Sequence, residues 1–538
     1  MVQFRFQRIR KLSALITGVI LVTSVSAQTT QINWVFFKNK GPISLQKPIR
    51  LSPVAERRLA LRGQDDSWLE IPVYEPYVDQ VELSGATIRQ RSRWFNAISI
   101  YTEADQELNQ ISQLECVLKI KPVAISSPIV STPMTPVFGK MTNLDYGESL
   151  TQNEMLGLNS LHSAGWTGEN VLIGVFDTGF NLNHPVFSQI DVIAGYDFVA
   201  HEANLDGTDS GHGTACTGLI GGYLPGEFIG AAYGARFLLA RTEDAASESH
   251  AEEDNWVAAL EWADALGVDV ISSSLAYKEF DNSSENYPTS ALDGNTTVIT
   301  QATNLAATRG ILVVNAMGNE GPGISSLWAP ADGAHVLSVG GVDRSQHVVS
   351  SSGQGPTADG RIKPDVVTLG TTVYLPSQSG GYYFGTGTSY ATPMIAGSAA
   401  LVLQVSPTLA PDSIIALFRS AGNRSNAPDN AFGWGVPNVG AIINKLTQQP
   451  ISNEQSYIWP NPVTATSLTI VLNKNKAPLA QSYRIINLRG QVVVEGKPEA
   501  VSVNEIRLSN LPQMASGLYF LTMNISTETF TAKFIYLP

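Results

Sequence analysis

The chain has 538 residues, 43% of them hydrophobic and 15% charged, and this balance favours folded domains over disorder. Its net charge of -13, without a cluster of lysines and arginines, excludes nucleic acid as a partner, because phosphate binding needs such a cluster. Two cysteines exclude a disulfide framework, and no His-Glu-x-x-His motif, Cys-x-x-Cys pair or phosphate-binding glycine loop occurs. The length predicts several domains.

Residues 1–27 have the pattern of a secretory signal peptide. Basic residues precede a short apolar stretch from Leu12 to Val22, and the small residues Val25-Ser26-Ala27 suit a cleavage site. The apolar stretch is too short for a membrane helix, and no later one reaches the roughly 18 apolar residues that such a helix needs. We therefore expect an exported protein without a transmembrane segment.

Residues 28–139 predict a small α+β domain and a linker. Four segments have the periodicity of regular elements: strands at 31–37 and 97–101, and helices at 51–61 and 107–111. The proline-rich stretch 126–138 is typical of an exposed linker. These residues alone leave the purpose of the domain open.

Residues 140–446 predict an α/β domain with a parallel sheet covered on both faces. Its predicted strands are apolar without alternation, at 171–176, 237–240, 268–272, 311–315 and 336–339. Helical patterns separate them, one of which runs from 255 to 266. Ligands of such sheets bind at the carboxyl ends of the strands, where Asp177 follows the first strand.

Three polar residues beside glycines predict a nucleophile and its activating groups. Ser389 follows Gly387-Thr388 and precedes a run of small apolar residues that predicts a buried helix, so backbone N–H groups would surround its hydroxyl. A serine needs a base, and His212, which lies between two glycines, supplies one. Together with Asp177 the order is Asp, His, Ser, as in subtilisin. Cys216, one helical turn after His212, should lie close to the imidazole.

The motifs Asp177-Thr178-Gly179, Gly211-His212-Gly213-Thr214 and Gly387 to Pro393 resemble those of the subtilase family. The resemblance implies a subtilisin-like fold and a serine endopeptidase. Ser389 would attack the peptide carbonyl, His212 would move the proton, and Asp177 would orient the imidazole. It also implies that residues 28–139 contain the propeptide that covers the active site until it is cleaved, although an ordinary accessory domain is the alternative.

The resemblance also implies an oxyanion donor and substrate-binding residues. Asn319, in a Gly-Asn turn after a predicted strand, would donate its amide where negative charge develops, together with the backbone N–H of Ser389. The substrate-binding residues would be Ser274, Leu275, Ala276 and Gly318. Because Ala276 stands where the family usually has glycine, its methyl group would narrow the first specificity pocket.

An acidic loop precedes the predicted helix 255–266. Glu252, Glu253 and Asp254 fit the dipole at the start of that helix. In subtilases this loop borders the P2 and P4 side chains of the substrate, so a preference for basic residues is the alternative. The loop 223–229 lacks the asparagines that family members use for calcium; we therefore assign no metal, expect no cofactor and leave calcium open.

Residues 455–538, after a polar linker at 447–454, predict an all-β sandwich with turns every 8–12 residues. Trp459-Pro460-Asn461-Pro462, Leu488-Arg489-Gly490 and the Gly517-Leu518-Tyr519 segment resemble the C-terminal sorting domain of type IX secretion in Gram-negative bacteria. A β-sandwich that binds substrate or carbohydrate is the alternative.

Together these patterns predict a secreted or cell-surface serine endopeptidase that acts on proteins or peptides through an acyl-enzyme. Its expected partners are those substrates and the type IX secretion machinery, and we expect a monomer. An exopeptidase of the same fold and a non-catalytic cell-surface adhesin are the two alternatives.

Overall fold

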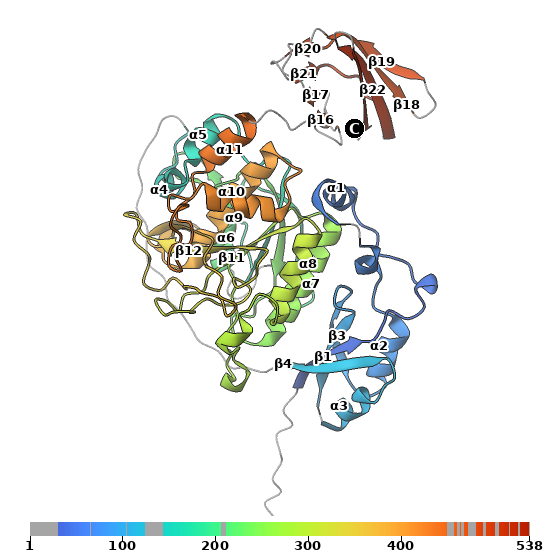
Figure 1. Ribbon diagram of the computed structural model, residues 1–538, viewed down its shortest axis with the longest axis vertical. Helices are drawn as coiled ribbons and strands as arrows, with labels where there is room; N and C mark the ends of the chain where they lie inside the picture. Colours follow the sequence, from blue (N-terminus) through green and yellow to red (C-terminus); the bar gives the residue numbers. More distant parts are fainter. Residues whose placement is uncertain are drawn as a thin grey trace, which may run out of the picture.

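The computed structural model describes residues 31–64, 66–103, 105–123, 144–205 and 211–448, and in the C-terminal part residues 457–459, 463, 467–471, 480–487, 491–500, 505–515, 517–525 and 528–536 (Figure 1). The predicted signal peptide, the proline-rich linker and the Pro-Asn-Pro and Leu-Arg-Gly motifs lie outside these residues. We refer below to an N-terminal domain (31–123), a central domain (144–448) and a C-terminal domain (457–536).

The central domain is built on seven parallel strands in the order β13-β12-β11-β10-β5-β9-β6. They are β5 (Leu172–Asp177), β6 (Asp191–Asp197), β9 (Arg236–Arg241), β10 (Val270–Ser273), β11 (Leu312–Ala316), β12 (Val336–Val342) and β13 (Val366–Leu369). Strands β5, β10, β11, β12 and β13 are buried throughout, and most of their side chains are apolar on both faces. The predicted parallel sheet is confirmed; the edge strands β6 and β13 are additions to the five predicted strands.

Helices cover both faces of this sheet. The helices of the central domain are α4 (Leu150–Met155), α5 (Leu158–Ser163), α6 (Gly211–Gly221), α7 (His250–Leu266), α8 (Val298–Thr308), α9 (Thr388–Val405), α10 (Pro411–Ser420) and α11 (Val439–Gln448). Side chains of α6 and α9 share one core, and those of α7 and α8 share the other. Two short hairpins complete the domain, β7 (Tyr223–Leu224) with β8 (Phe228–Ile229) and β14 (Val373–Pro376) with β15 (Tyr382–Gly385).

Helix α7 begins earlier than predicted, and the difference has a local cause. Helix α7 begins at His250, five residues before the predicted start, because Ser249 and Glu252 form a capping box that satisfies the first backbone N–H groups. Helix α6 begins at Gly211, so that His212 lies within the first helical turn rather than before the helix. The histidine is therefore fixed by a helix and not by a loop.

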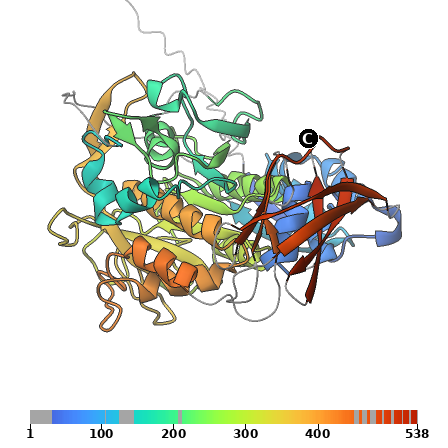
Figure 2. The same ribbon diagram turned by 90° about the horizontal axis from the view of Figure 1, so that it is seen from above.

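The N-terminal domain is a four-stranded antiparallel sheet in the order β2-β3-β1-β4, with helices on one face. Its elements are β1 (Gln31–Phe37), α1 (Pro53–Arg62), α2 (Glu75–Glu82), β2 (Thr87–Ser92), β3 (Ala97–Thr102), α3 (Asp105–Ser112) and β4 (Val117–Val123). Helices α2 and α3 share a core with one face of the sheet. The opposite face lies along α7 of the central domain, with Trp34 packed near Ala251 (Figures 1 and 2).

Helix α1 does not belong to the core of the N-terminal domain. Its sequence predicts a helix at 51–61, which the structure confirms within two residues, but α1 packs on α7 instead of on the sheet between β1 and β2. Helix α2 takes the place beside the sheet.

The C-terminal domain is the predicted β-sandwich. One sheet has the order β16-β17-β21-β20 and the other β19-β18-β22-β23, with buried side chains from both sheets in one core. The strands are β16 (Tyr457–Trp459), β17 (Leu468–Val471), β18 (Ala480–Asn487), β19 (Val492–Gly496), β20 (Glu499–Ala500), β21 (Glu505–Leu508), β22 (Gly517–Ile525) and β23 (Glu528–Tyr536). Over the part of the chain described here, no helix has the length and hydropathy that a membrane crossing requires.

Candidate active site

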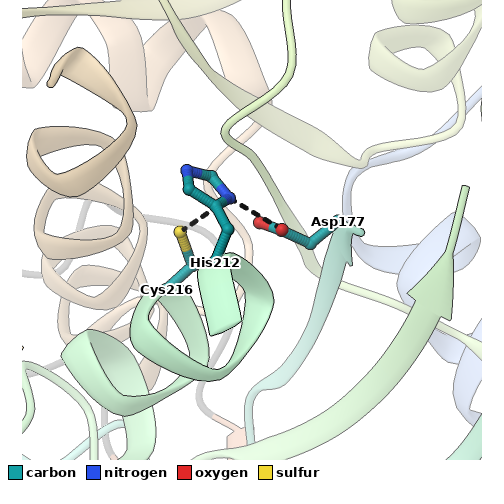
Figure 3. A group of neighbouring side chains, drawn as sticks. All are labelled: Asp177, His212 and Cys216. Atoms are coloured by element: carbon teal, nitrogen blue, oxygen red, sulfur yellow. Dashed lines mark hydrogen bonds and ion pairs between the residues drawn. The ribbon is translucent and has the colours of Figure 1, made fainter. Parts of the chain in front are cut away.

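Asp177 and His212 form a hydrogen-bonded pair at the carboxyl end of the sheet (Figure 3). Asp177 is the last residue of β5 and is fully buried, and its Oδ1 lies 2.7 Å from Nδ1 of His212. The N–H of Thr178 donates to the same Oδ1 at 2.8 Å. The carboxylate is thus held by its own turn and oriented toward the imidazole.

The pKa of His212 follows from two opposed effects. Burial alone would lower it, but the Asp177 carboxylate next to Nδ1 stabilises the imidazolium, and together with Cys216 it raises the pKa of His212 well above the usual 6.5. The side chain is still 28% exposed, which leaves a route for a substrate to reach the ring. Because Asp177 accepts a proton from Nδ1, the other nitrogen of the neutral ring is the basic one.

Ser389 lies in the first turn of α9, and Pro393 sets its surroundings. A proline inside a helix cannot donate to the carbonyl four residues earlier, which here is that of Ser389. Instead, Oγ of Ser274 donates to that carbonyl at 2.7 Å, and Sγ of Cys216 lies 3.6 Å from it. The missing helical hydrogen bond is thus replaced by side chains from the residue after β10 and from α6, so that three parts of the domain meet at the serine.

The structure brings Asp177, His212 and Ser389 to one place, although the serine hydroxyl is not yet turned to the histidine. Oγ of Ser389 donates to the carbonyl of Ser274 at 3.3 Å, and among the described residues no hydrogen bond joins Ser389 to His212. Sγ of Cys216 lies 3.9 Å from Nδ1 of His212, which brings the thiol close to the imidazole as the sequence predicts. In an empty site catalytic hydrogen bonds are often long or misaligned, and one rotation about χ1 redirects a serine hydroxyl.

Asn319 follows β11 and caps α9. Its Oδ1 accepts from the backbone N–H of Thr388 at 2.9 Å, so its Nδ2 must point the other way. A Cβ atom added to Gly387 would lie 3.7 Å from both Asn319 Nδ2 and the backbone N of Ser389. The side-chain amide of Asn319, whose Oδ1 is also 3.7 Å from that point, and the backbone N of Ser389 therefore both lie beside Gly387.

The predicted substrate-binding residues differ in what they have left to offer. The carbonyl of Leu275 already accepts from Nδ2 of Asn315 at 2.9 Å, and that of Gly318 accepts from the N–H of Gly353 at 3.0 Å. Ser274 is hydrogen-bonded to Ser389 through both its hydroxyl and its carbonyl group. Ala276 is half-buried at the end of this segment, so its backbone is the part best placed to meet a substrate strand.

Sequence reasoning missed the aromatic side of the site. The ring of Tyr390 lies 5.6 Å from that of His212, centroid to centroid. The sequence signal for this ring is the position of Tyr390 directly after Ser389, because successive residues in the first turn of a helix lie around the same opening.

The acidic loop serves partly as predicted. Glu252 and Glu253 lie in the first turn of α7, but Asp254 pairs instead with Arg89 of the N-terminal domain at 2.8 Å. Burial raises the pKa of Glu243 to about 7 and that of Glu248 to about 9, and nearby carboxyl groups add to both shifts. The raised pKa values reduce the negative charge that Glu243 and Glu248 carry at neutral pH and so weaken their attraction for a basic side chain, which favours the structural interpretation of the loop.

Among the described residues, two groups of side chains have donor atoms close enough together to hold a cation. One is Asp177, His212 and Cys216, and the other is Glu243, Glu248 and Glu252; within each group the donor atoms lie within 4.8 Å of one another. The first set contains a thiol and an imidazole, which suits soft metal ions, and the second offers only carboxylate oxygens.

Comparison with known proteins agrees with this geometry. The subtilase family model matches residues 168–435. Subtilisin DY of Bacillus licheniformis is 30% identical over 292 residues, which cover 53% of this chain and 96% of that protein. The chain belongs to the subtilase family. Subtilisin E of Bacillus subtilis is 31% identical over 253 residues, or 46% of this chain and 59% of that protein.

The chain spans 26% to 59% of the length of the curated relatives that it matches first. Among solved structures, that of fervidolysin from Fervidobacterium pennivorans superposes with a TM-score of 0.58 at 18% identity, covering 94% of this chain and 76% of that one. At this identity the likeness concerns the fold, which is that of a subtilase with an additional N-terminal domain and C-terminal strands.

The two outer domains also match families. The peptidase S8 propeptide domain of Bacteroidota matches residues 32–133, which confirms the predicted propeptide. The secretion system C-terminal sorting domain matches residues 457–536, which confirms the predicted type IX sorting domain and indicates secretion to the cell surface. The N-terminal domain is therefore the propeptide of this subtilase.

Proposed function

We propose that this subtilase is a serine endopeptidase whose catalytic residues are Asp177, His212 and Ser389. The observation that carries the proposal is the 2.7 Å hydrogen bond between Asp177 and His212 beside Ser389, at the carboxyl end of the parallel sheet. A buried carboxylate, an accessible imidazole and a serine at a helix start are the groups that acyl transfer needs.

In the proposed reaction, the Ser389 hydroxyl turns from the carbonyl of Ser274 to the free nitrogen of His212. His212 takes the hydroxyl proton as Oγ attacks the peptide carbonyl, and Asp177 stabilises the imidazolium that results. Nδ2 of Asn319 and the N–H of Ser389 hold the oxyanion. His212 then protonates the leaving amine. A water molecule next attacks the acyl-enzyme while His212 accepts its proton, and the acid product is released as His212 returns a proton to Ser389. No cofactor takes part.

An endopeptidase fits the proposed site better than an exopeptidase. Capture of a free amino terminus needs an unpaired carboxylate beside the substrate strand. Near Asp177, Glu243 is not a free carboxylate: burial raises its pKa to about 7, and its Oε1 accepts from the hydroxyl of Tyr277. Sequencing the products of a long unstructured peptide would reveal internal cleavage; release of short amino-terminal pieces alone would favour the exopeptidase.

Labelling with a fluorophosphonate probe tests the proposal directly. We expect one modified residue, Ser389, after cleavage of the linker, and no label in Ser389→Ala. Cys216→Ala serves as the matched control, because it changes the same cluster but keeps the nucleophile, and it should label. A wild-type chain that binds no probe after the N-terminal domain is removed would contradict the peptidase and favour the adhesin.

A further inference from the structure

Trp328 is a large apolar residue outside the hydrophobic core, although both of its neighbours in the chain lie within it. Leu327 and Ala329 are fully buried in the core that α7 and α8 share. Trp328 itself is half-buried and belongs to neither core of the central domain. Ala329 pairs with Tyr277 as in a β-bridge, and successive side chains of a strand-like segment point to opposite sides. The indole ring is therefore turned away from that core.

The indole ring lies on Gly318, one of the predicted substrate-binding residues. A Cβ built on Gly318 would lie 3.1 Å from Cγ and 3.3 Å from Cβ of Trp328. Gly318 has a φ of +92°, in the left-handed region that favours glycine. The N–H of Trp328 donates to the carbonyl of Met317 at 3.1 Å, which fixes the tryptophan beside the glycine. Trp328 thus occupies the space that a side chain at position 318 would fill.

Gly318 is linked to the residues around the nucleophile. Oγ1 of Thr388 donates to the carbonyl of Gly318 at 3.2 Å, and the backbone N–H of Thr388 donates to Oδ1 of Asn319 at 2.9 Å. Ser389 is the next residue of α9. In the proposed reaction, a peptide carbonyl held by Ser389 and Asn319 lies next to Gly318. The P1 side chain is attached to the carbon bonded to that carbonyl, so it meets whatever covers Gly318.

Ala276 adds bulk to the same region. Tyr277 and Ala329 are joined by two backbone hydrogen bonds, of 2.8 and 3.0 Å. Ala276 directly precedes one of these residues and Trp328 directly precedes the other, so the two side chains belong to paired segments. A methyl group and an indole ring therefore both take up room beside the predicted position of the P1 side chain.

We propose that Trp328 limits the size of the P1 side chain, so that this peptidase cleaves after small residues such as alanine, glycine and serine. The inference rests on the proposed serine endopeptidase and adds the class of its substrates. The ring is fixed by its backbone hydrogen bond and by its contact with Gly318, so a large P1 side chain has to displace it. Trp328 touches the substrate and determines specificity without taking part in proton transfer.

Competing peptides test this directly. Peptides of one sequence that differ only at P1, with Ala, Leu, Phe or Lys, are mixed with the full-length chain after its linker has been cleaved, and the products give relative kcat/KM values. Wild type should prefer Ala to Phe at least about tenfold, because the fit of one methylene group already changes kcat/KM by about 10–200-fold. Trp328→Ala should raise kcat/KM for the Phe peptide at least about tenfold relative to the Ala peptide.

Two further variants make the comparison sharp. Trp328→Leu keeps an apolar side chain and should give an intermediate ratio, and it takes the place of Trp328→Ala if that variant does not fold. Ile324→Ala is the matched control, because Ile324 lies four residues earlier in the same segment and is 87% exposed. Its ratio should stay within about twofold of wild type, as for an ordinary surface substitution.

Three results would overturn the proposal: cleavage after Phe or Leu as fast as after Ala, a preference for Lys through attraction to the ring, or an unchanged ratio in both Trp328 variants. Fluorophosphonate labelling of the same samples separates this inference from the peptidase reaction. A chain that labels at Ser389 without preferring small residues contradicts only the role of Trp328. A chain that neither labels nor cleaves contradicts the peptidase, and the inference fails with it.

Discussion

At the scale of single residues, a few neighbouring groups determine the protonation of His212. Asp177 touches Nδ1 of the ring, Cys216 lies one helical turn below it, and the ring of Tyr390 is beside it. Each contact can be changed without removing the nucleophile. Substitutions here therefore report on the proton and not only on the fold.

Asp177→Asn should move the pH profile. Because Asp177 raises the pKa of His212, and His212 acts as a base only when neutral, the acid limb of kcat/KM in the wild-type enzyme should lie above pH 6.5. Without the carboxylate the pKa falls, so the limb should shift to lower pH while kcat drops by about 10⁴, the size known for the equivalent change in a serine protease. Rates from pH 5 to 10 check both; an unmoved limb would contradict the assignment.

Asn319→Leu should lower kcat and leave KM nearly unchanged, because an oxyanion contact acts mainly in the transition state. A donor of this kind in subtilisin contributes about 10²–10³ in kcat, and we expect a loss of that order. The variant also removes the cap on Thr388, so its melting temperature is measured in parallel. If the variant loses stability but keeps kcat within threefold of wild type per titrated active site, Asn319 acts only as a helix cap. An oxyanion donor would change kcat far more than that.

Cys216 should make the enzyme sensitive to mercurials even though its nucleophile is serine. The thiol is fully buried, and burial raises its pKa, so modification should be slow. Mercury bound to Sγ of Cys216 would lie beside Nδ1 of His212, because Sγ and Nδ1 are 3.9 Å apart. Cys216→Ala should protect, and Cys116→Ala, which removes the other buried thiol in the N-terminal domain, should not. Time courses of inactivation compare the three proteins.

At the scale of elements, the contact between α6 and β5 positions Asp177 and His212 relative to each other. A Cβ added to Gly213 would lie 2.2 Å from the carbonyl oxygen of Gly179 and 3.0 Å from Cβ of Asp177, so the helix would have to move away from the strand. Close approach of two backbones is what requires glycine here. The histidine on that helix would move with it.

Gly213→Ala should therefore lower kcat/KM strongly and destabilise the fold by about 1–3 kcal/mol, the usual cost of overpacking. Gly211→Ala is the control, since its added Cβ would meet only the side chain of Gln378, at 3.5 Å. Activity per titrated active site and thermal unfolding are compared for both. Equal activity of the two variants would show that the packing of α6 does not set the position of His212.

The elements show how far the sequence alone could lead. Long apolar strands identify the parallel sheet, and the glycine-flanked polar residues identify the site, because both signals are local. The partner of α1 could not be predicted: a helix pattern does not say which domain it packs on, and Arg58, a residue expected in water, is buried among carbonyl groups. The early start of α7 was readable, since Ser249 and Glu252 have the spacing of a capping box. The hydrogen bond from Ser274 to Ser389 joins residues 115 apart and has no local signal.

At the scale of the whole molecule, the C-terminal domain has a core of its own, formed by both of its sheets. Helix α11 is the last element that contributes to the core of the central domain, and the predicted linker leads on from its end. Export and catalysis should therefore be separable. The peptidase needs the first part of the chain, and the secretion machinery needs the last.

Removal of residues 455–538 should leave activity within about twofold, because no described contact of the active site comes from that region, while export across the outer membrane of the native host should fail. A full-length chain with a peptide tag inserted at 449–454 controls for disturbance of the linker. Activity in cell extracts and in the medium is measured for both. Efficient appearance of the truncated form in the medium would contradict the sorting role.

The boundary between the propeptide and the peptidase also separates charge by sign. Of the ion pairs that cross it among the described residues, all but Arg309–Glu70 place the cation on the N-terminal domain; Arg58, Arg62, Arg89 and Arg93 face Asp254, Glu261, Asp264 and Asp269. Two copies of either partner would thus present like charges to each other, and like-charge contact opposes association. A domain that exposed this face would therefore meet repulsion from a second copy of itself at these positions and attraction from the other domain.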